Sequence, residues 1–277
     1  GGCAQHSGGI VSDGNTTFMG PGASGDEPQL LASRLKGIPL LVGKDRYQAS
    51  RCAINRFGLS VLVLDDAFQH LPLKRDLDLL LLDSARPFGN GHCIPRGTLR
   101  EPVEHMKRAS AFVLTRWAGQ EGLDRVNPMI KVHAGGHPVF RCMHVPDGLF
   151  VAGRKEVLDL ACLEGLRLFA FSGIVRNDSF RETISGLKGC IAGHLEFPDH
   201  HRYSQHDLRG IWEKARDLSV DNIITTEKDY VNISTGIPST PQLLILAISI
   251  SFGDDREAFE GYIKTLGAGE GSNPNPI

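Results

Sequence analysis

The most informative stretch of this chain is the segment Val61-Leu62-Val63-Leu64-Asp65-Asp66-Ala67-Phe68-Gln69-His70. Four apolar residues lead directly into two adjacent carboxylates, and an amide and an imidazole follow. The apolar run predicts a buried strand over residues 59–64, which would place the carboxylates at its carboxyl end. Open α/β sheets build their ligand sites at this end of their strands, and Mg²⁺ prefers carboxylate and other oxygen ligands. The alternative is a core strand that ends in an ordinary polar turn. It would explain the apolar residues, but not why the positions after them carry side chains of the kinds that bind ligands.

Other apolar runs alternate with helical patterns along the chain. Residues 1–25 hold eight glycines and are expected to form a loop. We expect strands at 39–42, 77–82, 111–115, 168–171, 223–226 and 243–248, and helices at 29–35, 46–57, 122–131, 180–187, 208–218 and 257–266. Apolar strands that alternate with helices are typical of a parallel sheet whose two faces are both covered.

The alternation is interrupted at residues 137–153, where apolar residues flank Pro146-Asp147-Gly148 and predict a β-hairpin. The simplest organisation is two linked α/β lobes, residues 1–135 and 136–266. The tail at 267–277 is rich in Gly, Asn and Pro and is expected to be disordered. The predicted fold class is therefore α/β, a parallel sheet with helices on both faces, in two lobes with a small β-hairpin insertion.

Composition narrows the class of protein. The chain has 277 residues and a formal net charge of −2, which argues against a dedicated nucleic-acid binder because such proteins carry a basic surplus. Six cysteines without a C-x-x-C pair indicate a reducing compartment. No apolar run approaches the roughly 18 residues that a membrane-spanning helix needs.

Two polar clusters carry side chains suited to phosphate or acid–base chemistry. Arg86-Pro87-Phe88-Gly89-Asn90-Gly91, followed by Pro95 to Pro102, combines glycines that expose backbone amides with arginines that suit phosphate oxygens. Phe197 to Tyr203 contains Asp199, His200 and His201, which could be metal ligands, acid–base groups or a polar helix entry. Because adjacent histidines point in different directions, one histidine acting with a carboxylate is favoured over two on one metal.

Two observations concern helix caps and phosphate loops. Thr226 to Asp229 fits a helix N-cap followed three residues later by an acid, and the structural and functional interpretations of this segment are about equal. No G-x-x-x-x-G-K-[ST] phosphate loop is present. The nearest segment, Gly37 to Lys44, contains a predicted strand between its glycines and cannot surround phosphates.

Taken together and in this order, the motifs resemble the tetraacyldisaccharide 4'-kinase family of the lipid A pathway. The resemblance extends to about residue 265, and nine motifs in series are highly specific. The matching segments are Ser24-Gly25-Asp26-Glu27-Pro28, Val42-Gly43-Lys44-Asp45-Arg46, Leu64 to His70, Lys74-Arg75-Asp76, Pro87 to Gly91, Pro95 to Pro102, Phe171-Ser172-Gly173-Ile174, Phe197 to His201 and Thr225 to Asp229.

The resemblance implies a P-loop NTPase-like fold and a lipid kinase. Such an enzyme transfers the γ-phosphoryl group of ATP, with Mg²⁺, to the 4'-hydroxyl of an acylated glucosamine disaccharide 1-phosphate. Its implied location is the cytoplasmic face of the bacterial inner membrane, with this fragment itself soluble. The anionic membrane surface is the expected partner, and the basic residues Arg96, Arg100, Lys107 and Arg108 fit either membrane contact or an ordinary solvated helix face.

The resemblance also assigns roles to residues. Asp65 and Asp66 match the acids that bind Mg²⁺. Asp26 matches the carboxylate that activates the acceptor hydroxyl, supported by either His200 or His201. The expected nucleotide- or substrate-binding residues are Gln69, Glu101, Arg100 and Arg46.

Two alternatives remain at this point. Asp199-His200-His201 superficially matches the Asp-His-His signature of metal-dependent phosphoesterases, in which Asp65 and Asp66 could supply further ligands. A non-catalytic module that binds the acylated disaccharide is the other alternative, and it is consistent with the lack of a phosphate-loop motif.

The chain departs from the family pattern in two places. Ala67 replaces a usual glycine, which is a mild change if its φ is negative and a strained one otherwise. Gly1-Gly2 aligns just after the family's Arg-Gly-Tyr-Gly segment, so the membrane helix, first strand and phosphate loop are expected upstream.

These 277 residues alone are therefore expected to bind ATP poorly and to have little kinase activity, because phosphate-loop amides and lysine supply much of the positioning and charge neutralisation. Calorimetric titration with ATP and transfer of labelled phosphate measure this. Robust turnover by the isolated chain contradicts the expectation.

Overall fold

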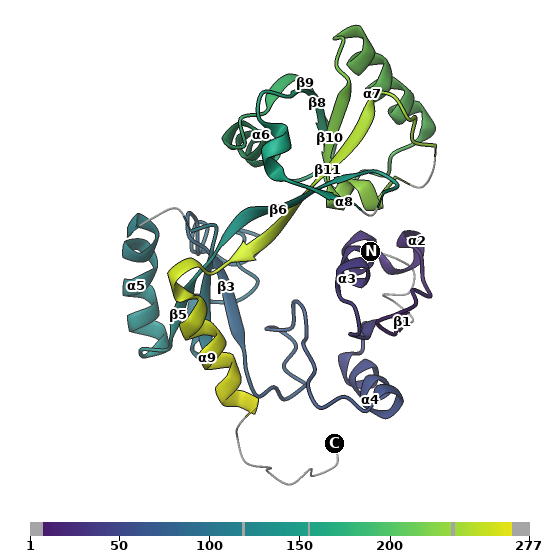
Figure 1. The fold of residues 1–277 in the computed structure, drawn as a ribbon. Helices are drawn as coiled ribbons and strands as arrows, with labels where there is room; N and C mark the ends of the chain where they lie inside the picture. Colours follow the sequence, from purple (N-terminus) through teal and green to yellow (C-terminus); the bar gives the residue numbers. More distant parts are fainter. Residues whose placement is uncertain (1–7, 118–119, 155, 234–235, 268–277) are drawn as a thin grey trace. The chain divides into compact units, whose positions relative to one another are not determined.

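The computed structural model describes residues 8–117, 120–154, 156–233 and 236–267, and Figure 1 labels most of its helices and strands. The chain forms two compact units: unit 1 comprises residues 1–63 and 146–248, and unit 2 comprises 64–145 and 249–277. This grouping differs from a division near residue 135, because the first sixty residues pack on the second half of the chain. The ion pair between Arg34 and Glu227 is one such contact. The expected disordered tail lies, apart from its first residue, outside the described residues.

Unit 1 contains a mixed sheet, a small two-stranded sheet and most of the helices. Its elements are β1 (Gly9–Ser12), α2 (Pro21–Ser24), α3 (Asp26–Arg34), β2 (Leu40–Val42), α4 (Arg46–Phe57), β7 (Val157–Leu158), η2 (Leu160–Leu163), β8 (Arg167–Ser172), α6 (Asn177–Gly186), β9 (Cys190–Glu196), α7 (Gln205–Asp217), β10 (Asn222–Thr226) and α8 (Glu227–Val231). Strands β6 (Met143–Val151) and β11 (Gln242–Ser251) lie mainly in this unit and cross its sequence limits.

Unit 2 is a smaller α/β unit. Its elements are β3 (Leu79–Asp83), η1 (Val103–Arg108), β4 (Ala111–Thr115), α5 (Gln120–Ala134), β5 (Val139–Arg141), η3 (Gly253–Asp255) and α9 (Arg256–Gly267).

The main sheet of unit 1 has the strand order β7-β6-β11-β10-β8-β9, and β11, β10, β8 and β9 are parallel. Side chains alternate between its faces, as the two-residue period of a strand requires. Phe169 and Phe171 of β8 pack in the core cluster that contains Trp212 of α7, and Leu168 packs in the cluster that contains Ile184 of α6. The predicted parallel sheet with helices on both faces is therefore confirmed in this unit.

Unit 2 repeats the arrangement with three parallel strands in the order β3-β4-β5. Phe112 of β4 is buried with Val126 of α5 and Met106 of η1. Phe140 of β5 packs instead against Phe259 of α9, with ring centroids 5.2 Å apart. The two helices thus pack on side chains that point in opposite directions from the strands.

The predicted strand at residues 59–64 is wrong. The segment has no regular structure, and the side chains of Val61 and Val63 are 73% and 93% exposed. It is the stretch in which the chain passes from unit 1 to unit 2. An apolar run in the sequence indicates only that its side chains favour burial. A strand also needs a neighbouring strand that forms hydrogen bonds with its backbone N–H and C=O groups. Among the described residues, no strand is paired with this segment.

The predicted hairpin turn at Pro146-Asp147-Gly148 is also wrong. Strand β6 runs through these three residues and pairs antiparallel with β7. Gly148 allows close packing here, because a Cβ atom on it would lie 3.2 Å from the Phe150 ring. The turn residues therefore lie inside a strand, where tertiary packing overrides the local turn preference. Strand β9 and the N-terminal elements β1 and α2 were not anticipated from the pattern.

Stability of unit 1 should depend on its central strand. Ile224 of β10 is fully buried, so Ile224→Ala should lower the free energy of unfolding by about 2–5 kcal/mol through lost burial and a cavity. Ile38→Ala, at an exposed position of the same unit, should change it by less than about 0.5 kcal/mol. In a Trp117→Phe background Trp212 is the one tryptophan left, and urea unfolding followed by its fluorescence reports on unit 1. Equal losses in the two variants contradict the assignment of the core.

Candidate functional site

Asp26 is the first residue of α3, and its carboxylate contacts a loop far away in sequence. Gly25 is the N-cap residue of this helix, and no side chain makes a cap hydrogen bond. Asp26 Oδ2 lies 2.7 Å from His200 Nδ1, across a separation of 174 residues, and accepts a longer bond of 3.4 Å from Asn232 Nδ2. Burial alone would raise the pKa of Asp26, but these two hydrogen bonds outweigh it and lower the pKa. Asp26 is therefore an ionised carboxylate at neutral pH.

The two adjacent histidines have different environments. His200 has a positive φ of 61°, and its ring lies between two acids, with Nδ1 at Asp26 and Nε2 3.3 Å from Asp199 Oδ2. His201 lies 3.2 Å from Asp207 Oδ2, and its ring stacks on Phe197 with centroids 4.6 Å apart. The structure thus brings His200, and not His201, to Asp26.

Helix α8 supplies contacts to the same region that the sequence did not reveal. Lys228 Nζ donates to Asp199 Oδ1 at 3.0 Å, and Asn232, just after the helix, reaches Asp26. Thr226 is the N-cap, and its hydroxyl accepts from the Asp229 amide as the cap pattern predicted. Asn232 had no recognisable sequence signal, because its role depends on where the chain leaves the helix.

The predicted magnesium ligands lie in unit 2, in a turn without regular structure. Asp66 has a positive φ of 47° and accepts two hydrogen bonds from Arg100 Nη1, at 2.7 and 2.8 Å. Ala67, in contrast, does not have a positive φ, so its methyl group brings no backbone strain. Within the described residues, no group of three or more His, Cys, Asp or Glu side chains is placed to hold a metal. Asp65 and Asp66 therefore fit a Mg²⁺ ion only if phosphate oxygens and water complete its shell, as is usual for this ion.

Two of the predicted nucleotide-binding residues contact one another. Glu101 accepts from Gln69 Nε2 at 2.8 Å and from Arg108 Nη2 at 2.9 Å, and it lies 2.9 Å from His105 Nδ1. Burial raises the pKa of Glu101, but these partners outweigh burial and lower it. Arg108 also lies over the ring of Phe68, 4.6 Å from its centroid. Glu101 thus holds the segment after Asp66 in place, a role that the sequence did not suggest.

The predicted basic surface is only partly available. Arg100 and Arg108 are engaged by Asp66 and Glu101, whereas Arg96 and Lys107 are exposed. None of the described helices combines the length and the hydropathy that a membrane span requires.

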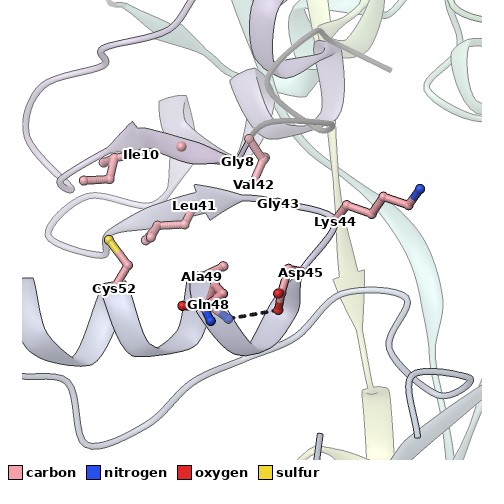
Figure 2. Close-up of a pocket in the computed structure, with 11 residues that line it drawn as sticks. Gly8, Ile10, Leu41, Val42, Gly43, Lys44, Asp45, Gln48, Ala49 and Cys52 are labelled. Carbon is pink, nitrogen blue, oxygen red and sulfur yellow. Dashed lines mark hydrogen bonds between the residues drawn. The ribbon is translucent and has the colours of Figure 1, made fainter. Parts of the chain in front are cut away.

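Arg46, the remaining predicted binding residue, is the first residue of α4, directly after the N-cap Asp45, whose carboxylate accepts from the Gln48 amide at 3.0 Å. A cavity of about 310 Å³ lies beside this helix start, between α4 and strands β1 and β2. Figure 2 shows that Leu41 and Ala49 face each other across it, while Lys44 extends away. The lining contains neither Asp26 nor His200, so the cavity is a feature separate from their contact.

The hydrogen bond from His200 should control the pKa of Asp26. His200→Ala removes the partner, so the pKa of Asp26 should rise toward its ordinary value, measured by NMR titration of ¹³C-labelled aspartate carboxyl groups. Because the folded-state pKa is lowered, the stability from this pair is present above the unfolded pKa and is lost as the pH falls through the folded value. The control is His206→Ala, which replaces an exposed histidine of α7. An unchanged Asp26 titration in His200→Ala would refute the contact.

Comparison with known proteins identifies the family. The family model described as tetraacyldisaccharide-1-P 4'-kinase matches residues 1–267. A tetraacyldisaccharide 4'-kinase of Desulfatibacillum aliphaticivorans is 40% identical over 276 residues, which cover 96% of this chain and 72% of the relative. One from Syntrophus aciditrophicus (strain SB) is 41% identical over 233 residues, covering 81% of this chain and 62% of the relative. The chain thus spans between about three fifths and three quarters of the length of these relatives.

The fold agrees with this result. The crystal structure of LpxK from Aquifex aeolicus in complex with ATP matches with a TM-score of 0.72 and 25% identity, covering 94% of this chain and 75% of that one. The α/β, P-loop NTPase-like fold class is thereby confirmed. The chain therefore belongs to the tetraacyldisaccharide-1-P 4'-kinase family, an ATP-using phosphotransferase family of lipid A biosynthesis.

Proposed function

We propose that this chain transfers the γ-phosphoryl group of ATP to the 4'-hydroxyl of an acylated glucosamine disaccharide 1-phosphate, and that Asp26 accepts the hydroxyl proton. The family establishes a kinase that acts on a lipid disaccharide. The observation that carries the residue assignment is the 2.7 Å contact between Asp26 and His200, because it joins two polar groups from distant segments.

The geometry suits a general base. Asp26 is ionised at neutral pH, because its hydrogen bonds to His200 and Asn232 lower its pKa. Both partners contact Oδ2, and Oδ1 is the oxygen proposed to accept the proton of the acceptor hydroxyl. His200 fixes the orientation of the carboxylate, since its ring is held on the opposite side by Asp199. A positioned base of this kind contributes roughly 10²–10⁴-fold to a rate.

The cofactors are ATP and Mg²⁺, which supply the phosphoryl group and neutralise charge on the phosphates when bound. Asp65 and Asp66 are proposed to hold the ion together with phosphate oxygens. Arg100 and Arg46 are proposed to contact phosphate groups, since a guanidinium matches phosphate geometry. Gln69 and Glu101 are proposed to support this segment through their mutual hydrogen bond.

The phosphoesterase alternative gains no support from the histidine loop. It would use His200 and His201 as ligands of one metal centre. Instead, His201 points to Asp207 and stacks on Phe197.

The proposed place of action is the cytoplasmic face of the bacterial inner membrane. ATP is present on that side, and the acyl chains of the substrate favour the bilayer through burial of apolar groups. The exposed Arg96 and Lys107 suit an anionic surface, where each basic residue adds about 1 kcal/mol of binding.

Transfer of labelled phosphate from ATP to a tetraacyldisaccharide 1-phosphate, in the full gene product, tests the proposal. Asp26→Asn should lower kcat by about 10²–10⁴-fold, while Asp178→Asn, an exposed carboxylate of α6, should leave it unchanged. Substrate in anionic vesicles should be used faster than substrate in zwitterionic vesicles. Full activity of Asp26→Asn would exclude Asp26 as the base, and equal rates in both vesicles would exclude the anionic surface.

A further inference from the structure

A second acid in unit 1 is buried close to the His200 loop and has no part in the proposed proton transfer. Asp229 is only 1% exposed. Its Oδ1 accepts hydrogen bonds from the Gly173 amide and the Tyr203 hydroxyl, both at 2.8 Å, and its Oδ2 accepts one from the Thr226 hydroxyl at 2.6 Å. A buried carboxylate is tolerated only when hydrogen-bond donors satisfy it. The burial of Asp229 therefore requires Gly173, Tyr203 and Thr226 to stay next to it.

The donors come from both sides of the segment that carries His200. Gly173 follows strand β8, and Tyr203 follows the histidines by two residues. Between these points the Phe197 amide donates to the Ser172 carbonyl at 2.9 Å. The segment from Phe197 to Tyr203 is therefore fixed at its beginning by the end of β8 and at its end by Asp229.

Gly173 allows the segment from Phe197 to Tyr203 to approach the end of β8 closely. A Cβ atom at this position would lie 2.9 Å from the Pro198 carbonyl oxygen, 3.1 Å from Asp229 Oδ1 and 3.2 Å from His201 Cβ. Only a glycine permits this approach without displacement of its neighbours. The ring of Tyr203 adds an edge contact to His201, with centroids 4.9 Å apart. The chain on both sides of the exposed His200 is thus held by contacts that lead to Asp229.

The same short helix also contacts the partner of His200. Helix α8 contains Asp229, and Asn232, directly after it, donates to Asp26. The Asn232 amide in turn donates to the Asp229 carbonyl at 3.0 Å. A displacement of Asp229 would therefore disturb both members of the Asp26–His200 contact.

We propose that Asp229 is a positioning residue, which acts through Tyr203 and Gly173 to hold His200 within hydrogen-bond distance of Asp26. This inference rests on the proposed function only where it predicts an effect of Asp229 on the reaction rate. The effect of Asp229 on the contact between Asp26 and His200 does not depend on that function. The left-handed backbone of His200 fits this role, because a non-glycine residue keeps such a conformation only when its surroundings impose it.

Two variants test the proposal with a matched control. Tyr203→Phe removes one donor to Asp229 and keeps the ring, and Asp229→Asn removes the charge with little change of shape. Tyr230→Phe is the control, because Tyr230 neighbours Asp229 on α8 but its hydroxyl accepts from the Gly153 amide instead. Two quantities are measured in the full gene product: the Asp26 pKa by ¹³C NMR, and kcat and KM for phosphoryl transfer.

Tyr203→Phe should raise the pKa of Asp26 and lower kcat by about 10-fold, with KM changed less than about twofold, because misplacement of a catalytic group affects the chemical step. Tyr230→Phe should change neither quantity. If Tyr203→Phe and Asp229→Asn fold normally, or only lose stability, while the Asp26 pKa and kcat stay as in the parent, the proposal is overturned. Asp26→Asn with full activity would instead refute the proposed function, and the Asp26 pKa in Tyr203→Phe would still decide the positioning role.

Discussion

The buried carboxylate of Asp229 is the interaction on which the candidate site of unit 1 depends. A charge in the protein interior is costly unless donors surround it, and the donors here are Gly173, Tyr203 and Thr226. Burial holds the pKa of Asp229 above its ordinary value, and the same hydrogen bonds offset this only in part. The three donors lie on different segments of the chain: the end of β8, the loop that carries His200 and the start of α8. The hydrogen bonds to this one carboxylate therefore fix the three segments together.

The sheet explains why these segments meet. Strands β10, β8 and β9 are neighbours and run parallel, so their carboxyl ends lie along one edge. Gly173 follows β8, Phe197 follows β9, and Thr226 ends β10. Ligand sites of open α/β sheets form at this edge. The strand order thus places the loops of the candidate site next to one another at this edge, and the buried Asp229 fixes their positions relative to one another.

Sequence reasoning succeeded where the signal was local or where a series of motifs carried it. Helix α4 was predicted at its observed limits, and the structure shows Gly58 in the left-handed conformation after its last residue. The pairing of Asp26 with a histidine came from the resemblance, and the structure selects His200. The strand at 59–64 failed because an apolar run does not reveal whether a neighbouring strand exists. The roles of Asn232 and Tyr203 were not predicted, because their contacts depend on tertiary structure, of which a single sequence carries no direct record.

The acids and arginines of unit 2 have a different physical character. Asp66 and Arg100 are each 61% exposed, so their pairing contributes little stability in water. Arg108, in contrast, is partly buried between Glu101 and the Phe68 ring, where a planar guanidinium retains its orientation. An exposed pair can exchange partners at small cost, which suits the Mg²⁺-binding role proposed for Asp66. The neighbouring Glu101, in contrast, is bonded to Gln69, His105 and Arg108 and so holds its segment through several contacts at once.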